Sequence, residues 1–369
     1  MRILFINELC GTGSHGKLAA EQAERFERDG HEVRIAYGRH PNVPDRYKRY
    51  AVRIGSKFDV YVHALMTRLT GRHGFFSRRA TKKFLRWADD YDPEFLWLHN
   101  IHGYYINIEL LFSWIKSRPG MKVFWTLHDC WSFTGHCAHF TFERCAKWRT
   151  HCEHCPRTNK YPASFVDASY ENFDRKRNLF TGVRDMTLIT PSKWLADLVK
   201  ESFLKGYPVE VHYNTIDENI FKPTPSDFRE RHNLVGKKII LGVASVWEER
   251  KGLDDFVRLS KMLDAEKFAI VLVGLKPEQI AKLPKEIIAI RRTNNQKELA
   301  EIYTAADVFL NPTYEENYPT VNLEAEACGT PVITYDTGGC RETLKREDSK
   351  VIPCGDIEAA KEIIEREKI

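Results

Sequence analysis

Short apolar runs alternate with helical stretches from one end of the chain to the other. The runs are rich in Val, Ile and Leu, which is typical of strands buried on both faces of a parallel sheet. A first series of expected strands occupies 2–7, 32–38, 95–99, 122–128 and 186–191. After 208–214 the pattern restarts, and a second series occupies 238–245, 268–274, 287–292, 307–312 and 331–336. Two such series predict an α/β protein with two Rossmann-like domains, 1–213 and 214–369.

The composition agrees with two domains, because 369 residues exceed what one core usually holds. No apolar run approaches the length that spans a bilayer. The apolar run near the N-terminus is too short for a signal peptide, so we expect a cytoplasmic protein. Nine cysteines in a reducing compartment favour thiols or metal ligands over disulfides.

The net charge of +5 hides a strongly basic stretch at 46–86. This stretch contains twelve Lys or Arg residues and one acid, Asp59. One interpretation is a solvated helix face. The other is a surface for anionic lipid head groups or an anionic acceptor, which would place the chain peripherally on the inner face of the plasma membrane. No nucleic-acid recognition motif accompanies the charge, so we expect no nucleic-acid partner.

A glycine-rich loop follows the first expected strand, where ligands of such sheets usually bind. The sequence GTGSHGK fits both G-x-G-x-x-G and G-x-x-x-x-G-K, so Gly13 and Gly16 are candidates for contact with a phosphate. We expect Ser14 to cap the following helix. Neither pattern is complete: Leu18 stands where a magnesium-binding hydroxyl is needed, and Arg39 where an acid for NAD is expected. Arg39 keeps an NADP enzyme open as an alternative, and a tight structural turn is another.

The segment EENYPTVNLEAEACGTPVITYDTGG, residues 315–339, carries two acids eight positions apart, Glu316 and Glu324. We expect a short helix at 321–328, with Thr320 as its N-cap and with Gly329 and Pro331 ending it. Free N–H groups at the start of such a helix suit a diphosphate, and carboxylates suit hydroxyls. The segment therefore predicts a ligand that contains both.

This segment closely resembles the E-x7-E motif of the retaining GT-B glycosyltransferases of family 4. The segments VHYNTIDENIFKP, ASVWEERKGLDDF, ELAEIYTAADVFLNPTYEE and TLHD resemble further motifs of that family, so the resemblance covers nearly the whole chain. The cysteine-rich stretch and HNIHGYYINI resemble a bacterial exopolysaccharide-type subgroup. The resemblance implies a GT-B fold, in which two Rossmann-like domains face each other across a cleft. The first domain would hold the acceptor and the second a nucleotide sugar.

The resemblance also implies roles for individual residues. Glu324 should bind the ribose hydroxyls, and Glu316 the sugar hydroxyls near the reacting carbon. Lys251 should neutralise the leaving diphosphate, and His128 should contact the donor sugar or the attacking region. The catalytic candidates are thus Glu316, His128 and Lys251, and the donor-binding candidates are Glu324, Arg250, Asn317, Tyr318, Thr320, Val321, Gly13 and Gly16.

Two departures from the family pattern stand out. Val246 occupies a position that usually carries Arg, five residues before Lys251, and Arg250 is the nearest substitute. The family usually ends in a helix that crosses back to the first domain; here that part is the segment 356–369. No Asp-x-Asp motif is apparent, so we expect no cofactor to be needed for catalysis. The resemblance implies front-face attack by the acceptor hydroxyl with help from the leaving phosphate.

The leading hypothesis is therefore a retaining hexosyl-type transferase that moves a sugar from a UDP- or GDP-sugar to a glycan or a polyprenyl-diphosphate-linked acceptor. An NADP-dependent oxidoreductase that uses the GTGSHG loop is the first alternative, and it leaves Glu316, Glu324 and Lys251 unexplained. A non-catalytic protein that binds a nucleotide sugar is the second.

A cysteine- and histidine-rich insertion, 130–155, follows the strand that ends near His128. Cys152 and Cys155 form a C-x-x-C knuckle, a common part of zinc sites. Cys137 and Cys145 are the expected partners, and Cys130 is the spare. We expect a structural zinc here, with an iron–sulfur cluster, disulfides and free thiols as alternatives.

Overall fold

The computed structural model describes residues 1–39 and 42–366. The chain forms two compact units, Met1–His212 and Tyr213–Ile369. The sequence places the boundary one residue later, after 213. Each unit has its own sheet and its own hydrophobic cores, and each is described here by itself.

The first unit contains a seven-stranded sheet with the strand order β3-β2-β1-β4-β5-β6-β7. Every neighbouring pair is parallel, as the sequence predicts. Its strands are β1 (Arg2–Asn7), β2 (Glu32–Tyr37), β3 (Ala51–Arg53), β4 (Phe95–Leu98), β5 (Lys122–Thr126), β6 (Met186–Thr190) and β7 (Val209–Val211). The short strand β3 was not expected, because it lies in the basic stretch and has only three residues.

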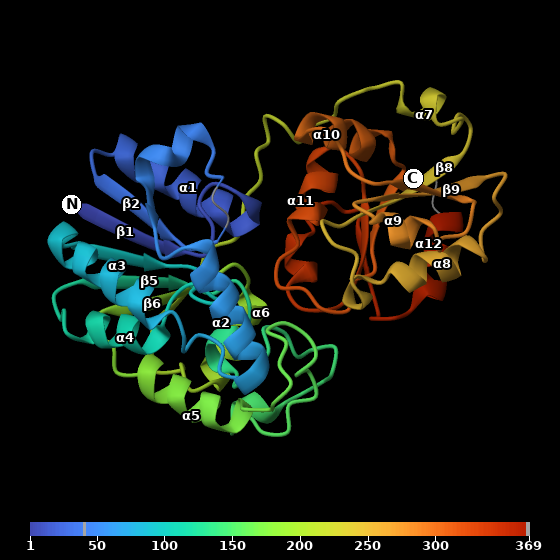
Figure 1. Ribbon diagram of the computed structural model, residues 1–369. Coiled ribbons are helices and arrows are strands. Elements are labelled where there is room, and N and C mark those ends of the chain that lie inside the picture. Colours follow the sequence, from blue (N-terminus) through green and yellow to red (C-terminus); the bar gives the residue numbers. More distant parts are fainter. Residues whose placement is uncertain (40–41, 367–369) are drawn as a thin grey trace. The chain divides into compact units, whose positions relative to one another are not determined.

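Helices cover both faces of this sheet (Figure 1). They are α1 (Gly13–Arg28), α2 (Lys57–Thr70), α3 (Arg78–Tyr91), α4 (Ile108–Lys116), α5 (Ser169–Phe180) and α6 (Lys193–Glu201). Successive side chains of a strand point to opposite faces, so one strand supplies both cores. Ile3 and Phe5 join the core under α1, whereas Leu4 and Ile6 join the larger core that includes α3, α4 and α5.

The second unit contains a six-stranded parallel sheet with the order β10-β9-β8-β11-β12-β13. Its strands are β8 (Lys238–Val243), β9 (Phe268–Val273), β10 (Ile287–Ile290), β11 (Val308–Asn311), β12 (Val332–Tyr335) and β13 (Lys350–Ile352). Its helices are α7 (Phe228–Arg231), α8 (Leu253–Ser260), α9 (Pro277–Ile280), α10 (Gln296–Ala305), α11 (Thr320–Ala327) and α12 (Ile357–Arg366). Both sheets thus follow the order of a Rossmann-like domain, which confirms the expected fold class.

The final helix belongs to the core of the second unit. Ile357, Ala360 and Ile364 of α12 are fully buried, and they share a hydrophobic cluster with Phe256 and Leu259 of α8. The last part of the expected C-terminal helix, 367–369, lies outside the described residues. In the described part of the chain no helix has both the length and the apolar character that a membrane crossing requires.

Several histidines of the first unit are buried without a charge. Burial lowers the pKa of His63 and of His99 to about 3, and burial with the charge of Lys176 lowers the pKa of His136 to about 4. Burial also holds the pKa of His73 well below its usual value. These rings are neutral in the folded chain near neutral pH, and each takes up a proton in the unfolded chain below pH 6.5.

We expect acidification to destabilise the first unit. Because the unfolded chain binds more protons than the folded chain below pH 6.5, each such histidine costs about 1.4 kcal/mol of stability for every pH unit below that point, until its folded pKa is reached. Thermal unfolding followed from pH 7.5 to 5.5 should show a falling Tm. The variant His63→Gln should flatten this slope, because it removes one of the buried neutral rings. A Tm that is independent of pH would contradict the assignment.

Candidate active site

The motif residues of the second unit meet at the carboxyl ends of β8 and β11. Lys251 ends a short 3-10 helix, Glu249–Lys251, that follows β8, and Glu316 lies in the loop after β11. The ammonium group of Lys251 forms an ion pair with Glu316 Oε2. The side chains of Lys251 and Glu316 are 20% and 19% exposed. The structure therefore places a cation and a carboxylate in contact, both within reach of solvent.

Arg250 does not point the same way as its neighbour. Its Nη1 donates to the carbonyl of Glu315 at 2.9 Å, and its Nε lies 3.1 Å from Glu248 Oε2. The carbonyl of Arg250 also accepts a hydrogen bond from the amide of Tyr314 at 2.8 Å. Arg250 thus holds the loop that carries Glu316, and Lys251 is the cation that faces the carboxylate.

Two glycines let these loops approach closely. Gly252 has φ +70°, and a Cβ built there would lie 2.2 Å from the carbonyl oxygen of Pro312. Gly338 has φ +55°, and its Cβ would lie 1.7 Å from the carbonyl oxygen of Glu316. The next amide, that of Gly339, donates to the carbonyl of Asn317 at 2.9 Å. The backbone around Glu316 is therefore fixed from both sides by segments that admit no side chain.

Glu324 lies one turn into α11, as expected. The hydroxyl of Tyr303, on α10, donates to Glu324 Oε2 at 3.1 Å. Tyr303 is fully buried, and its burial and the nearby Glu324 raise its pKa well above the usual range, so its hydroxyl stays a donor. This buried phenol holds one carboxylate oxygen of Glu324 in place and was not recognised in the sequence.

The start of α11 differs from the expectation. The helix begins at Thr320, which is its first helical residue and not its N-cap; Pro319 holds the N-cap position without a side-chain hydrogen bond. The first turn is fixed from inside instead, because Asn322 accepts from Asn311 at 2.8 Å and donates to Thr343 at 2.9 Å. Tyr318 stacks on Tyr213 with ring centroids 5.2 Å apart. Asn317, Tyr318, Thr320 and Val321 thus form one continuous segment beside Glu316.

Asp255 is a further residue that sequence reasoning missed, although it lies only four positions after Lys251. Its buried carboxylate accepts hydrogen bonds from Tyr314 at 2.7 Å and from Tyr335 at 3.0 Å. Burial and this hydrogen bond raise the pKa of Tyr314 to about 12. Asp255 therefore positions the start of the Glu316 loop from the core.

In the first unit, the helix after the glycine-rich loop begins earlier than the sequence predicts. Helix α1 begins at Gly13, and its N-cap is Thr12 where Ser14 was expected. A Cβ at Gly13 or at Gly16 would lie 2.9 Å from the side chain of Leu9. Gly13 also has φ +66°, so both glycines have a structural role in this turn, and their contact with a phosphate stays a prediction.

Glu8, next to this loop, is tied to two basic side chains. Its carboxylate lies 2.8 Å from His15 Nε2 and 3.4 Å from Arg39 Nη1. Burial raises the pKa of Glu8, but the hydrogen bond from His15 and the charges of His102 and Arg39 outweigh it and lower the pKa overall. Arg39, the candidate for a 2′-phosphate, is therefore engaged by an acid of its own unit.

His128 follows β5 and packs on two other histidines. His99 Nδ1 and His128 Nε2 lie 3.1 Å apart, and the two rings stack at 5.3 Å. The ring of His15 lies 5.6 Å from His128. Burial, together with His99 and His15, keeps the pKa of His128 well below its usual value. His128 is therefore neutral at physiological pH and can serve as a hydrogen-bonding group without adding charge.

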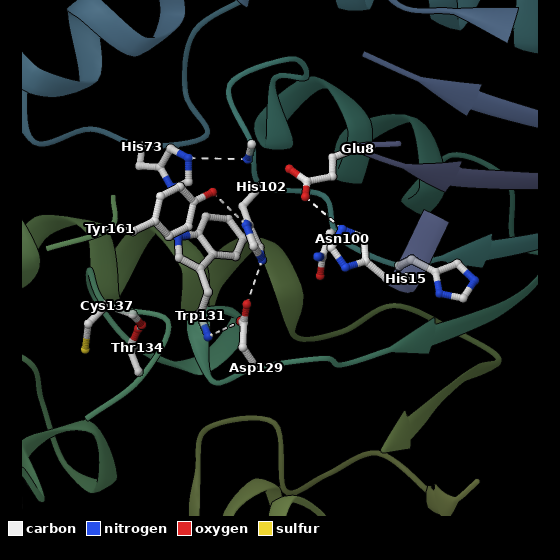
Figure 2. Close-up of polar contacts among 12 residues, drawn as sticks. Glu8, His15, His73, Asn100, His102, Asp129, Trp131, Thr134, Cys137 and Tyr161 are labelled. Carbon is white, nitrogen blue, oxygen red and sulfur yellow. Dashed lines mark hydrogen bonds and ion pairs between the residues drawn. The ribbon is translucent and has the colours of Figure 1, made fainter. Parts of the chain in front are cut away.

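Asp129 and His102 form a second acid–histidine pair, in addition to Glu8 and His15 (Figure 2). His102 Nε2 lies 3.0 Å from Asp129 Oδ2, and His102 Nδ1 lies 2.9 Å from the hydroxyl of Tyr161. Asp129 also accepts from the amide of Trp131 at 2.9 Å. Burial raises the pKa of Asp129, but His102 and these hydrogen bonds hold it well below its usual range. His102 stands within the segment HNIHGYYINI and Asp129 within TLHD, so the motifs marked this place without identifying the pair.

The cysteine-rich insertion is ordered by short turns and aromatic packing. Cys137, Cys145, Cys152 and Cys155 line one small cavity together with Phe140 and Trp148, and Cys130 is not among its lining residues. The thiols of Cys137 and Cys155 are hydrogen-bonded to each other. In residues 1–39 and 42–366, no group of three or more His, Cys, Asp or Glu side chains stands ready to hold a metal ion. A zinc site here would require the four sulfurs to draw together, and it stays a proposal.

The proposed zinc site in the cysteine-rich insertion predicts that the native chain retains the metal and that a cysteine variant loses it. We expect protein purified without added metal to contain about one zinc per chain, and Cys152→Ser to lose it, because a closed site needs all four thiolates. Metal analysis measures this, and the exposed cysteine Cys354 supplies a control, Cys354→Ser. A metal-free native protein with full activity would reject zinc.

Substitution of Gly338 should disturb the Glu316 loop. Gly338→Ala brings a Cβ against the Glu316 carbonyl, so the loop must move, and nucleotide-sugar affinity and turnover should fall about tenfold or more. Gly236→Ala is the matched control, because Gly236 also has a positive φ (+82°) but has no atom within 4 Å of its Cβ position. Equal effects of the two variants on the site would contradict the contact argument.

Comparisons with known proteins agree with this geometry. The chain is 26% identical to a protein of Escherichia coli (strain K12) that is provisionally named colanic acid biosynthesis glycosyl transferase WcaC. The alignment covers 95% of this chain and 87% of that protein. A Campylobacter jejuni N,N′-diacetylbacillosaminyl-diphospho-undecaprenol alpha-1,3-N-acetylgalactosaminyltransferase matches 32% of this chain and 31% of its own length, at 31% identity.

Two solved structures match the whole fold. A sucrose-phosphate synthase from Thermosynechococcus elongatus has a TM-score of 0.70 at 17% identity, and Anabaena HepE in complex with UDP has 0.65 at 15%. Each match covers 99% of this chain and 89% of the other. The family model for glycosyl transferases group 1 matches residues 226–367, and that for glycosyltransferase family 4 matches residues 16–220, more than half of the chain. The chain belongs to glycosyltransferase family 4.

Proposed function

We propose that the chain is a retaining hexosyl-type glycosyltransferase that uses a UDP- or GDP-sugar in polysaccharide biosynthesis. The observation that carries the proposal is the contact between Lys251 and Glu316, with Glu324 on the adjoining helix. This set combines one cation, two carboxylates and a helix N-terminus, which suits a diphosphate flanked by hydroxyl-bearing groups.

In this proposal Glu324 accepts hydrogen bonds from the ribose hydroxyls of the donor. Tyr303 already occupies one of its oxygens and so leaves the carboxylate oriented rather than free to rotate. The N-terminus of α11, where Pro319 provides no side-chain cap, offers backbone N–H groups to the diphosphate. Asn317 and Tyr318 belong to the same segment and line the donor.

Lys251 supplies the charge that the leaving diphosphate needs, and Glu316 orients Lys251 and binds sugar hydroxyls. Arg250 acts on the loop backbone, so it is a positioning residue rather than a second phosphate ligand. The acceptor hydroxyl attacks on the face of the departing phosphate, which takes up its proton. The positive charge comes from the protein, so the proposal requires no cofactor for catalysis.

For the acceptor we propose a glycan or a polyprenyl-diphosphate-linked glycan. The relatives support this class, since one is named for colanic acid biosynthesis and another for transfer to an undecaprenol-diphosphate-linked sugar. His128 and the Asp129–His102 pair of the first unit offer hydrogen-bonding groups for sugar hydroxyls. UDP is the first nucleotide to test, because HepE, which shares the fold, was solved with UDP.

The NADP-dependent alternative is not favoured. Arg39 is paired with Glu8, and the glycines of the GTGSHG loop are used for packing on Leu9. A non-catalytic binding protein would share the donor site, and product formation separates it from an enzyme.

A nucleotide screen with matched variants tests the proposal. UDP, GDP, their sugars and NADP should be compared by thermal shift, and UDP- or GDP-sugars should stabilise the native chain. Glu324→Gln should weaken nucleotide-sugar binding about tenfold to a hundredfold, because a charge-assisted hydrogen bond to the ribose is lost. Glu316→Gln should mainly lower turnover. The control Glu358→Gln, at an exposed ion pair, should change neither. Stabilisation by NADP alone, or native turnover in both site variants, would reject the assignment.

A further inference from the structure

Lys176 is a fully buried lysine on α5 to which the proposed chemistry gives no role. Lysine is almost never fully buried, because its charged group loses its water and needs partners in exchange. Burial accordingly keeps the pKa of Lys176 well below its usual value. The partners of this side chain therefore indicate what it contributes to the unit.

The partners of Lys176 belong to one turn, the short 3-10 helix Trp131–Phe133 and the residue after it. Lys176 Nζ donates to the carbonyl of Trp131 at 2.7 Å and to the carbonyl of Thr134 at 3.0 Å. The same nitrogen lies 3.4 Å from the centroid of the Trp131 ring. Trp131 and Thr134 are both buried, so their carbonyls need a donor from the protein. Lys176 thus holds Trp131 by its backbone and by the face of its ring.

Trp131 in turn contacts both members of the Asp129–His102 pair (Figure 2). Its amide donates to Asp129 Oδ1 at 2.9 Å, and its ring lies 5.1 Å from the ring of His102. The other oxygen of this carboxylate, Oδ2, lies 3.0 Å from His102 Nε2. The place of Trp131 therefore determines which oxygen of Asp129 is left to face His102.

Thr134 joins the same turn to the cysteine-rich insertion. Its hydroxyl donates to the carbonyl of Cys137 at 2.5 Å. The amide of Cys130, just before the turn, donates to the carbonyl of Ala138 at 2.8 Å. The turn is thus closed against the insertion on one side and against Lys176 of α5 on the other.

A second buried donor on α5 shows that the effect of Lys176 is local. Asn172 lies one helical turn before Lys176, on the same side of the helix, and is also buried. Its side-chain amide donates to the carbonyl of Gly71 at 2.7 Å, at the end of α2. Two similar donors on one helix therefore hold two different segments, and the segment that Lys176 holds is the one that carries the acid–histidine pair.

We propose that Lys176 is a positioning residue that acts through Trp131 to fix the Asp129–His102 pair for an acceptor hydroxyl. Its side-chain nitrogen holds the turn, the turn places the Trp131 amide, and the amide orients the carboxylate of Asp129. The link to the acceptor rests on the proposed function. The effect on the pair itself does not, because it is a property of the free chain.

Nitrogen-15 NMR of the histidine rings tests the positioning without any substrate. Lys176→Met keeps the length of the side chain but removes the donor, so it should shift the ring signals of His102, which are identified by their loss in His102→Gln. Lys176→Gln keeps an amide donor on a shorter side chain, and should shift them in the same direction but less, even where Lys176→Met folds poorly. Asn172→Ala is the matched control, since it removes a buried donor to a carbonyl from the same helix, and it should leave the His102 signals native.

Kinetics with UDP-glucose and a polyprenyl-diphosphate-linked oligosaccharide test the link to the acceptor. Lys176→Met and Lys176→Gln should lower kcat/KM for the oligosaccharide, by about tenfold or more in Lys176→Met, and leave KM for UDP-glucose unchanged, because only the acceptor side is disturbed. Asn172→Ala should lower Tm and leave both constants native. Shifted His102 signals with native acceptor kinetics would overturn the link to the acceptor.

Two NMR results would overturn the positioning itself. One is a set of native His102 signals in both Lys176 variants. The other is an equal shift in Lys176→Met and Asn172→Ala, which would show a general loosening of the unit. A native chain that transfers no sugar would contradict the proposed function instead, and the NMR comparison would still decide whether Lys176 holds the pair.

Discussion

The ion pair between Lys251 and Glu316 joins two loops that leave neighbouring strands, β8 and β11. Parallel strands bring such loops to one edge of the sheet, but they do not by themselves set the distance between two side chains. Here that distance is set by backbone contacts, because Gly252 lies against Pro312 and Gly338 against Glu316. These close approaches leave no room for a side chain between the segments, and such packing favours a fixed distance between the cation and the carboxylate.

In the first unit, the groups that follow the strands are buried acids and histidines, and their neighbours determine which of them carry a charge. Glu8 and Asp129 are both buried to a large degree, yet both keep lowered pKa values because a histidine bonds to each. The neighbouring rings of His99 and His128 are kept neutral by burial. Together these ionised acids and neutral imidazoles offer both acceptors and donors with little net positive charge. Such a set of groups suits polar, hydroxyl-rich ligands better than it suits phosphates.

Sequence patterns predicted the architecture well, since every strand expected in the two series is present and the strands outside them, β3, β7 and β13, have only three residues each. They also located the segments of the site, because glycines, prolines and acids at fixed spacing leave a clear signal. They could not give side-chain partners. The pairing of Glu324 with Tyr303, or of Asp255 with Tyr314, joins residues more than twenty positions apart on different elements. For Gly13 and Gly16 the pattern predicts contact with a ligand, and the structure adds that a Cβ at either position would crowd Leu9, which the sequence could not indicate.

In helix α2 the apolar side chains face the opposite way from what their spacing predicts. Its apolar spacing alone predicts an ordinary surface helix with the stripe of Phe58, Leu65 and Leu69 packed inward. The fold instead buries His63, whose neutral ring must be desolvated and given two hydrogen bonds, and leaves the apolar side chains in water. Burying that stripe would stabilise the unit, so stability alone does not account for this orientation.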